Sequence, residues 1–219
     1  MTTESLYPFL YGRTANAAEL LTDVSRSTRD KVVEIGRLRE TMLASDGPAL
    51  AACASAMAER FDQGGRLYVF GNGGSSTDAL AIATLHTTPG PSGRPLPAVA
   101  LPADVATLTA LANDVGFEVV FARPIVAAGR AVDIAMGLST SGGSANVVRG
   151  LEAAHRSGML TVGLAGYSGG AMAETAERGE VDHLFVMPSA SVHRIQEAQT
   201  TVYQVLWELV QVALGESPA

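Results

Sequence analysis

Two short segments rich in glycine and hydroxyl residues carry side chains that could bind an anionic ligand. The first, "GNGGSS" at 71–76, follows the apolar run "YVF" and precedes a helix-like stretch. The second, "STSGGSAN" at 139–146, offers four hydroxyls and two glycines within six residues. Glycine lets backbone N–H groups approach an anion, and a helix start adds positive partial charge. The pattern predicts a phosphate monoester held by hydroxyls and backbone amides rather than by Lys or Arg.

Both segments also have a simpler interpretation. A single glycine-rich turn is often an ordinary strand-to-helix connection, and Ser144 could act only as the N-cap of the following helix. Two nucleotide-binding motifs do not fit. Ser76 stands where the last glycine of G-x-G-x-x-G belongs, and the lysine of the P-loop is absent. A third turn, "YSGG" at 167–170, is similar to the first two but weaker.

Short apolar runs alternate with helix-length stretches and must position these segments. Runs of four to seven residues without polar alternation indicate strands buried on both faces, which is typical of a parallel sheet. The runs lie at 66–70, 98–101, 132–138, 160–164 and 183–187. Strands that alternate with helices predict an α/β fold with a doubly wound parallel sheet. Ligands of such sheets bind beyond the carboxyl ends of the strands, which is where the hydroxyl-rich segments begin.

Long helices are predicted at both ends of the chain. Helical spacing in the first 45 residues is shown by Leu20, Leu21, Val24, Val32, Ile35, Leu38 and Met42. A second helix is predicted from Gly47–Pro48 to Phe61, because Pro is favoured at a helix start. The stretch 190–215 predicts a long C-terminal helix, and the Pro- and Gly-rich stretch 87–97 is interpreted as a surface loop.

The chain shows no internal repeat and no linker, so the sequence predicts one domain over residues 1–219. Within it, residues 1–62 are expected to form N-terminal helices for oligomer packing. Residues 66–214 are expected to form the sheet core and the C-terminal helix. An apolar stripe at helical spacing is typical of core or of an oligomer contact.

Composition narrows the class of protein. With 47% hydrophobic and 17% charged residues, the chain has the make-up of a compact α/β protein and not of a disordered one. The net charge of −7 argues against direct binding of nucleic acid. Cys53 is the single cysteine, which excludes an internal disulfide or a cysteine-rich zinc site. No leader and no apolar stretch of roughly 18 residues is visible, so we expect a cytoplasmic protein without membrane contact.

Four motifs resemble, in order and spacing, the sugar isomerase (SIS) domain proteins of the phosphoheptose isomerase group. They are "GNGGSSTDA", "ALANDVGF", "LSTSGGSANVVRGLEAA" and "RIQEAQ", and the resemblance covers nearly the whole chain. That family converts sedoheptulose 7-phosphate into heptose 7-phosphate. The resemblance implies a five-stranded parallel sheet flanked by helices. It also implies a homotetramer with active sites at subunit contacts.

The resemblance further implies which residues bind a sugar phosphate. The phosphate would be held by the serine loop, which consists of Ser139, Thr140, Ser141 and Ser144. The sugar site would be lined by Asn72, Gly73, Ser75 and Asp114, together with Gln196 of "RIQE".

The chain departs from the family pattern at the zinc ligands. Family members place a His six residues after the Ser of "GNGGS" and a Glu four residues later, so both lie on one helix face and share a zinc ion. Those positions are Ala81 and Leu85 here. The other family ligands are the Gln of "RIQE", kept as Gln196, and a His eight residues later, which is Gln204. The sequence therefore predicts no metal and no cofactor.

The missing Glu also serves the family as a proton-transferring base, so catalysis would need a replacement. His193 stands where the family usually has Asp, and an imidazole is suited to proton transfer. Glu197 is the kept acid of "RIQE", although a salt bridge or a helix-terminal charge would also explain it. His86 points away from the position of the lost Glu, and His155 and His183 are interpreted as structural or solvated.

Three functions are compatible with these residues. The first is a metal-independent aldose–ketose isomerase acting on a phosphorylated sugar, with sedoheptulose 7-phosphate as the first choice. The second is a non-catalytic SIS-domain sensor of a phosphosugar, or a tetrameric interaction platform resembling the DnaA-associating replication regulators. The third is an isomerase with an altered substrate in secondary metabolism. An isomerase needs a base within reach of sugar carbons C1 and C2, whereas a platform needs an exposed patch for a partner.

Overall fold

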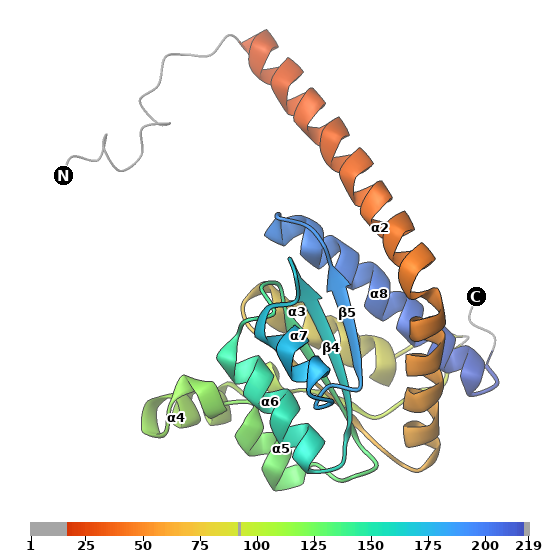
Figure 1. Ribbon diagram of the computed structural model, residues 1–219, viewed down its shortest axis with the longest axis vertical. Coiled ribbons are helices and arrows are strands. Elements are labelled where there is room, and N and C mark those ends of the chain that lie inside the picture. The colour runs from red at the N-terminus through yellow and green to blue at the C-terminus, as the bar shows by residue number, and fades with distance from the viewer. Residues whose placement is uncertain (1–16, 92, 217–219) are drawn as a thin grey trace. The chain divides into compact units, whose positions relative to one another are not determined.

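A computed structural model describes residues 17–91 and 93–216 of the chain (Figure 1). The chain divides into two units, Met1–Arg37 and Leu38–Ala219, and the boundary lies inside helix α2 (Ala17–Asp62). The single domain over residues 1–219 stays a prediction. Residues 1–16 of the predicted oligomer-packing segment lie outside the described residues.

Helix α2 is one element where the sequence predicts two. It runs from Ala17 to Asp62 with Pro48 inside it, so the break expected at Gly47–Pro48 is wrong. Proline lacks the amide N–H of a helix interior and disfavours that position. Burial after the proline outweighs this local preference, because Leu50, Cys53 and Met57 are all buried.

Five parallel strands form one sheet in the order β2-β1-β3-β4-β5. The strands are β1 (Leu67–Gly71), β2 (Ala98–Ala100), β3 (Ile134–Ser139), β4 (Leu160–Gly166) and β5 (His183–Met187). The five apolar runs of the sequence coincide with these strands to within two residues at each end. Every residue of β1, β3 and β4 is buried, as expected for strands covered on both faces.

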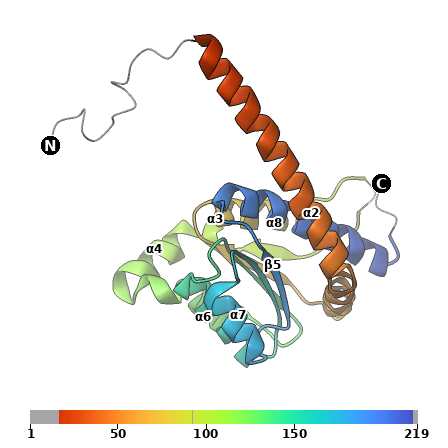
Figure 2. The same ribbon diagram turned by 45° about the horizontal axis from the view of Figure 1, so that its top comes forward.

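Helices cover both faces of this sheet (Figures 1 and 2). One face carries α5 (Ala122–Ala128), α6 (Ala145–Arg156) and α7 (Gly170–Glu177). Its core includes Phe70, Phe121 and Leu151. The opposite face carries α3 (Gly74–Thr87) and α8 (Val192–Ala213), which contact one another. The predicted doubly wound α/β fold, with long N- and C-terminal helices, is therefore confirmed.

The connection from β2 to β3 is the longest stretch between neighbouring strands of the chain. It contains the short turn η2 (Leu101–Ala103), α4 (Val105–Asp114), the turn η3 (Phe117–Val119) and then α5. The side chain of Asp104 caps α4 by accepting a hydrogen bond from the Thr107 amide at 3.0 Å. This connection places the motif "ALANDVGF" at the end of α4.

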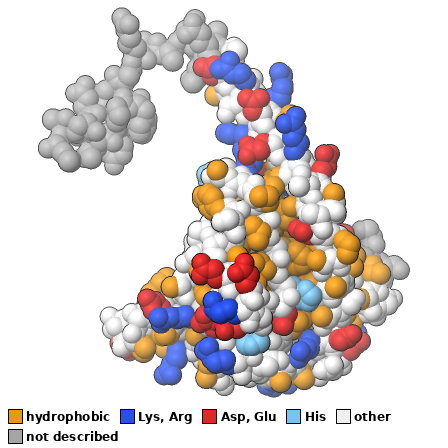
Figure 3. All heavy atoms as spheres, in the orientation of Figure 1, with side chains coloured by type: hydrophobic (Ala, Val, Ile, Leu, Met, Phe, Trp, Pro, Cys, Tyr) orange, Lys and Arg blue, Asp and Glu red, His pale blue; other side chains and the backbone are white. Residues whose placement is uncertain are grey.

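Acidic and basic side chains are interspersed over the surface of the first turns of α2 (Figure 3). Arg26 and Asp23 form an ion pair of 2.5 Å on that surface. Within residues 17–91 and 93–216, no helix is both long enough and apolar enough to span a lipid bilayer.

Candidate functional site

The candidate site lies beyond the carboxyl ends of β1 and β3. From β1 the chain first crosses to β2 on one side and then returns to β3 on the other side. In open α/β sheets ligands bind at this change of direction, and the region beyond the ends of β1 and β3 is called the crevice below. Gly71 at the end of β1 pairs in register with Leu138 of β3, and Ser139 ends that strand. The two segments singled out in the sequence therefore meet at the switch point of the sheet.

A pair of amides joins the two segments. The Asn72 Nδ2 donates to Asn146 Oδ1 at 2.8 Å, and the Asn146 Nδ2 donates to Asn72 Oδ1 at the same distance. Asn146 is only 4% exposed and follows the serine loop in the first turn of α6. Asn146 is not among the site residues predicted from the sequence. The sequence feature that could have identified it is an amide side chain in the helix that begins directly after the serine loop.

Two hydroxyls of the serine loop lie close to that of Ser139. The Ser139 hydroxyl is 2.9 Å from the Ser144 hydroxyl and 3.4 Å from that of Ser141. Ser141 in turn accepts a hydrogen bond from the Gly143 amide at 3.1 Å. Ser144 occupies the N-cap position of α6, but its side chain makes no capping hydrogen bond. Helix capping therefore does not account for this hydroxyl, which faces the cluster instead.

The start of α3 forms the opposite side of the crevice. Gly73 has a φ of 54° at the N-cap position, a backbone conformation that favours glycine. Gly74 lies against the side-chain amide of Gln196, leaving no room for a Cβ atom. Ser75 is buried in the same turn. The structure thus places Gln196 of α8 at the amino end of α3, next to the first glycine-rich segment.

The turn after β4 supports the serine loop from the other side. Gly142 has a φ of 65° and lies so close to the Gly169 carbonyl that a side chain would not fit. The Met172 amide donates to the Gly142 carbonyl at 2.9 Å. Tyr167 adopts a φ of 52°, which is uncommon for a residue with a side chain. The weaker "YSGG" motif therefore contacts and holds the serine loop.

Two acidic residues of the predicted site lie on exposed surface. Asp114 ends α4 and accepts a hydrogen bond from the Asn113 side chain at 2.7 Å. Within the described ranges, no hydrogen bond joins Asp114 to the serine loop. The Glu197 side chain is 45% exposed and accepts a hydrogen bond from Arg194 Nη1 at 2.8 Å. This is the salt bridge that the simpler interpretation of Glu197 expected.

His193 is exposed in the first turn of α8, three residues before Gln196. Residues spaced by three or four positions share a helix face. His193, Gln196 and Glu197 therefore lie on one side of α8, and the packing of Gln196 against Gly74 brings that side to the crevice.

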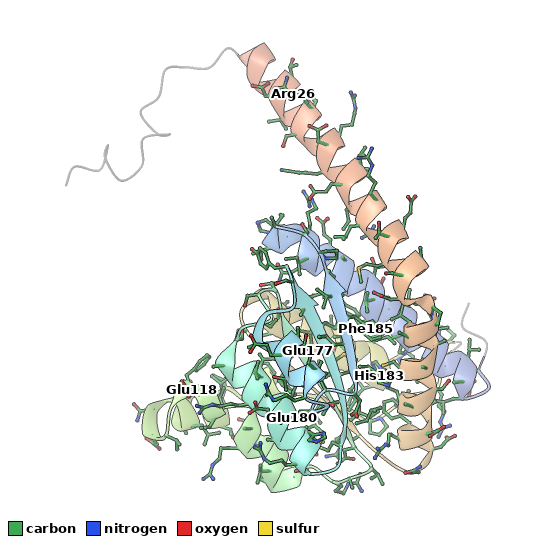
Figure 4. The ribbon with its side chains drawn as sticks, in the orientation of Figure 1. Arg26, Glu118, Glu177, Glu180, His183 and Phe185 are labelled. Carbon is green, nitrogen blue, oxygen red and sulfur yellow. The ribbon has the colours of Figure 1, made fainter. Side chains whose placement is uncertain are left out.

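The other histidines lie outside the crevice. Burial lowers the pKa of His86 to about 4, and its Nδ1 donates to the Ile82 carbonyl at 2.8 Å. His183 begins β5, at the end of the strand opposite the crevice (Figure 4), and burial also lowers its pKa. His155 is exposed in the last turn of α6. These positions agree with a structural or solvated role.

The residues at the family's zinc positions do not fit a zinc site. Ala81 and Leu85 lie on α3 and have no atom that coordinates a metal. On α8, Gln196 keeps the residue type of the family ligand, but Gln204 offers an amide where the family has an imidazole, so one of the four ligand positions is kept. Across the described part of the chain, no group of three His, Cys, Asp or Glu residues is arranged to hold a metal ion.

Asp78 is a second residue that the sequence analysis missed. It lies on α3, within the motif "GNGGSSTDA", and its Oδ2 is buried with no hydrogen-bond partner among the described residues. Burial raises the pKa of its carboxyl. The sequence feature that could have identified Asp78 is its spacing. It falls three residues after Ser75 and three before Ala81, so the three residues lie along one side of the helix.

Comparison with known proteins identifies relatives of the same architecture. A family model described as SIS domain matches residues 32–166. A phosphoheptose isomerase of Roseiflexus is 41% identical over 180 residues, which cover 82% of this chain and 89% of the relative. One from Aquifex aeolicus is 43% identical over 164 residues, or 74% of this chain and 83% of the relative.

Solved structures agree with the sequence relatives. The phosphoheptose isomerase of Neisseria gonorrhoeae superposes with a TM-score of 0.78 at 32% identity, covering 85% of this chain and 99% of that one. That of Francisella tularensis gives a TM-score of 0.76 at 30% identity, covering 90% of this chain and all of that one. By sequence, strand order and three-dimensional likeness, the chain belongs to the SIS domain family.

Proposed function

We propose that this protein is a metal-independent aldose–ketose isomerase of a phosphorylated sugar, with sedoheptulose 7-phosphate as the first substrate to test. The observation that carries the proposal is the meeting of the serine loop and the Asn72 segment at the switch point of the sheet. Relatives named phosphoheptose isomerase, more than a third identical over most of the chain, support the choice of substrate.

The serine loop binds the phosphate in this proposal. Ser139, Ser141 and Ser144 already converge, and Thr140 lies between them in the chain. The exposed amide end of α6 adds the positive end of a helix dipole, and backbone N–H groups of a glycine-containing loop accept an anion without a nearby cation. Neutral donors suit a dianionic monoester in an acidic protein because they add no charge that must be buried.

The residues on the α3 side orient the sugar. The Asn72 side chain is held by Asn146, and the Gln196 side chain lies against Gly74. Together with Gly73 and Ser75 they present amides and a hydroxyl to the sugar hydroxyl groups. Asp114 is proposed as a further sugar contact, provided by the exposed end of α4.

Aldose–ketose isomerisation moves a proton between C1 and C2 through an enediol, and it requires a base. His193 and Glu197 are the candidates from the sequence, and both stand on the side of α8 that reaches the crevice. The relatives' zinc positions are Ala81, Leu85 and Gln204 in this chain, so the proposed reaction uses protein side chains alone. We further propose a homotetramer with sites at subunit contacts, in which exposed residues such as Asp114 complete the site.

A non-catalytic sensor is the second candidate, and the exposure of His193 together with the Arg194–Glu197 ion pair favours it. Both candidates bind the sugar phosphate, but only the first breaks a carbon–hydrogen bond. Measuring binding and exchange in the same sample therefore separates them.

The deciding experiment is NMR of sedoheptulose 7-phosphate in deuterated water, with and without excess chelator. Deuterium entering C1 or C2, with new heptose signals that persist in chelator, is the expected result. Turnover abolished by chelator would contradict metal independence. No exchange, with a sugar-dependent rise in melting temperature, would favour the sensor. Neither exchange nor binding would contradict both candidates.

A further inference from the structure

The carboxylate of Asp78 is an unusual group on α3. Its Oδ2 is buried without a hydrogen-bond partner within residues 17–91 and 93–216. Buried polar atoms in native proteins almost always have partners, and exceptions are concentrated at functional positions. The buried carboxylate of Asp133 shows the contrast: it accepts hydrogen bonds from the Arg66 and Arg130 amides, both at 2.8 Å.

Asp78 lies near the amino end of α3, the end that adjoins the proposed sugar site. It follows Ser75 by three residues on α3, so the two side chains lie on neighbouring turns of one face. In an α-helix the Cα–Cβ bond tilts toward the amino end. The amino end of α3 is the glycine turn at 73–74 beside Gln196, so the Cα–Cβ bond of Asp78 tilts toward that turn.

The neighbours of Asp78 keep its carboxylate poorly solvated. Tyr203 of α8 is 6% exposed, and its pKa is raised first by burial and also by the negative charge of Asp78. The tyrosine hydroxyl is hydrogen-bonded to Thr200, on the same helix. Burial raises the pKa of Asp78 itself, which brings a carboxylate closer to the working range of a general base.

The next turn of α3 leaves space beside this carboxylate. Ala81, three residues further on, is exposed and has the smallest side chain other than glycine. A ligand anchored by the serine loop can extend along this face without meeting a large side chain at Ala81.

We propose that Asp78 is the catalytic base of this protein, the carboxylate that carries the proton between C1 and C2 of the sugar. This inference rests on the proposed isomerase function and names its base. It replaces His193 and Glu197, because both of those side chains are exposed and Glu197 is already paired with Arg194.

The proposed step balances without any further reactant. The Asp78 carboxylate takes a proton from C1 of the ketose, and the electron pair of that C–H bond forms the C1–C2 double bond. The carbonyl electron pair moves to the C2 oxygen, which takes a proton from water and completes the enediol. The enediol then loses a hydroxyl proton from the C1 oxygen to water, an aldehyde forms at C1, and the Asp78 carboxyl returns its proton to C2.

The test compares Asp78→Asn with the wild type and with Asp62→Asn, which removes an exposed carboxylate at the end of α2. The measurements are deuterium exchange into sedoheptulose 7-phosphate and the melting temperature with and without that sugar. We expect Asp78→Asn to lower the exchange rate by roughly 10²–10⁴-fold. It should keep the sugar-dependent rise in melting temperature. Its melting temperature should be no lower than that of the wild type, because the Oδ2 of the replaced carboxylate has no hydrogen-bond partner among the described residues.

Three results would overturn the inference while leaving the proposed function intact. They are exchange at the wild-type rate in Asp78→Asn, loss of its sugar-dependent melting shift, and failure of that variant to fold. The last two would show that the carboxyl is structural. Absence of exchange in the wild type would instead overturn the isomerase function, and the inference with it. Wild-type exchange in Asp62→Asn, with loss in Asp78→Asn, is the supporting result.

Discussion

The side-chain amides of Asn72 and Asn146 exchange two hydrogen bonds of 2.8 Å across the switch point of the sheet. Asn72 follows β1 and Asn146 begins the helix after β3, so this pair fixes the spacing of the two loops that form the crevice. A reciprocal amide pair uses one donor and one acceptor of each side chain. Each amide keeps a second N–H and a second lone pair for a ligand.

Replacing Asn146 by Ala is expected to lower the free energy of unfolding by about 1–3 kcal/mol, because Asn72 loses its partner beside a buried position. Binding of sedoheptulose 7-phosphate should weaken as the Asn72 amide becomes free to turn. Urea unfolding and a ligand titration followed by melting temperature measure the two effects. Gln63→Ala, an exposed amide at the end of α2, is the control and should change neither. Unchanged binding in Asn146→Ala would contradict a positioning role for this pair.

Removing the Ser139 hydroxyl is expected to weaken binding of the sugar phosphate by about tenfold or more, because hydrogen bonds to charged groups are stronger than neutral ones. The Ser139 hydroxyl contacts those of Ser141 and Ser144, so its loss disturbs the whole cluster. Isothermal titration with the sugar phosphate and with inorganic phosphate measures the change. Ser157→Ala removes a hydroxyl that donates to the Ala153 carbonyl, away from the serine loop, and should bind normally. Equal affinity in Ser139→Ala would place the phosphate elsewhere.

The sheet could be predicted from the sequence because its strands are buried on both faces and read as unbroken apolar runs. The loops that follow β1 and β3 could be predicted because glycine and serine cluster directly after two apolar runs, and glycine is favoured where φ is positive, as at Gly73 and Gly142. The helix start at Gly47–Pro48 could not be predicted correctly. Pro48 favours the start of a new helix, but burial of residues far apart in the chain keeps α2 continuous.

Asn146 and Asp78 show why part of the site escapes sequence reasoning. The role of Asn146 depends on Asn72, which is 74 positions away and becomes a neighbour only when β1 and β3 pair. Spacing alone puts Asp78 on one face of α3, but the missing hydrogen-bond partner of its Oδ2 among the described residues is visible only in the fold. The serine hydroxyls, by contrast, could be recognised from the sequence, because they are closely spaced along the chain.

Stability is expected to fall as the pH falls from about 6.5 to about 4, because His86 must stay neutral in the folded protein. Its folded pKa of about 4 lies below the unfolded value of 6.5, so the contribution is complete above pH 6.5 and is lost toward pH 4. A shift of this size corresponds to about 3 kcal/mol. Urea unfolding at a series of pH values measures the slope.

The matched variants for this pH dependence are His86→Leu and His155→Gln. Carboxylates add their own acid slope, but that slope is common to all three proteins. The difference between wild type and His86→Leu should therefore shrink from pH 7 to pH 4, and His155→Gln, which replaces an exposed histidine, is the comparison variant. Parallel curves for wild type and His86→Leu would contradict a buried neutral imidazole.

Restoring donor atoms on α3 and α8 is expected to create a zinc site. The triple variant Ala81→His, Leu85→Glu and Gln204→His places imidazole and carboxylate four residues apart on one helix face, with a second imidazole on α8. Zinc content after dialysis, measured by atomic absorption, should rise to about one ion per chain, against a background level in the wild type. Moving the carboxylate to Leu80 in place of Leu85 puts it on a different face and is the control. Zinc retained by the wild-type chain would contradict the donor set described above.

The apolar side chains in the first turns of α2 predict self-association. Leu21 is 67% exposed and Val32 is 64% exposed, and Val24 lies between them. Exposed apolar side chains at helical spacing mark a contact surface, and closed symmetric assemblies are the common result when one chain provides it. Light scattering after size exclusion should give four times the 22.6 kDa mass of the chain. Val24→Glu with Val32→Glu should lower that mass, while Ser27→Glu should not. A wild-type monomer at micromolar concentration would contradict the tetramer, and an unchanged mass in the double variant would place its contacts outside these turns.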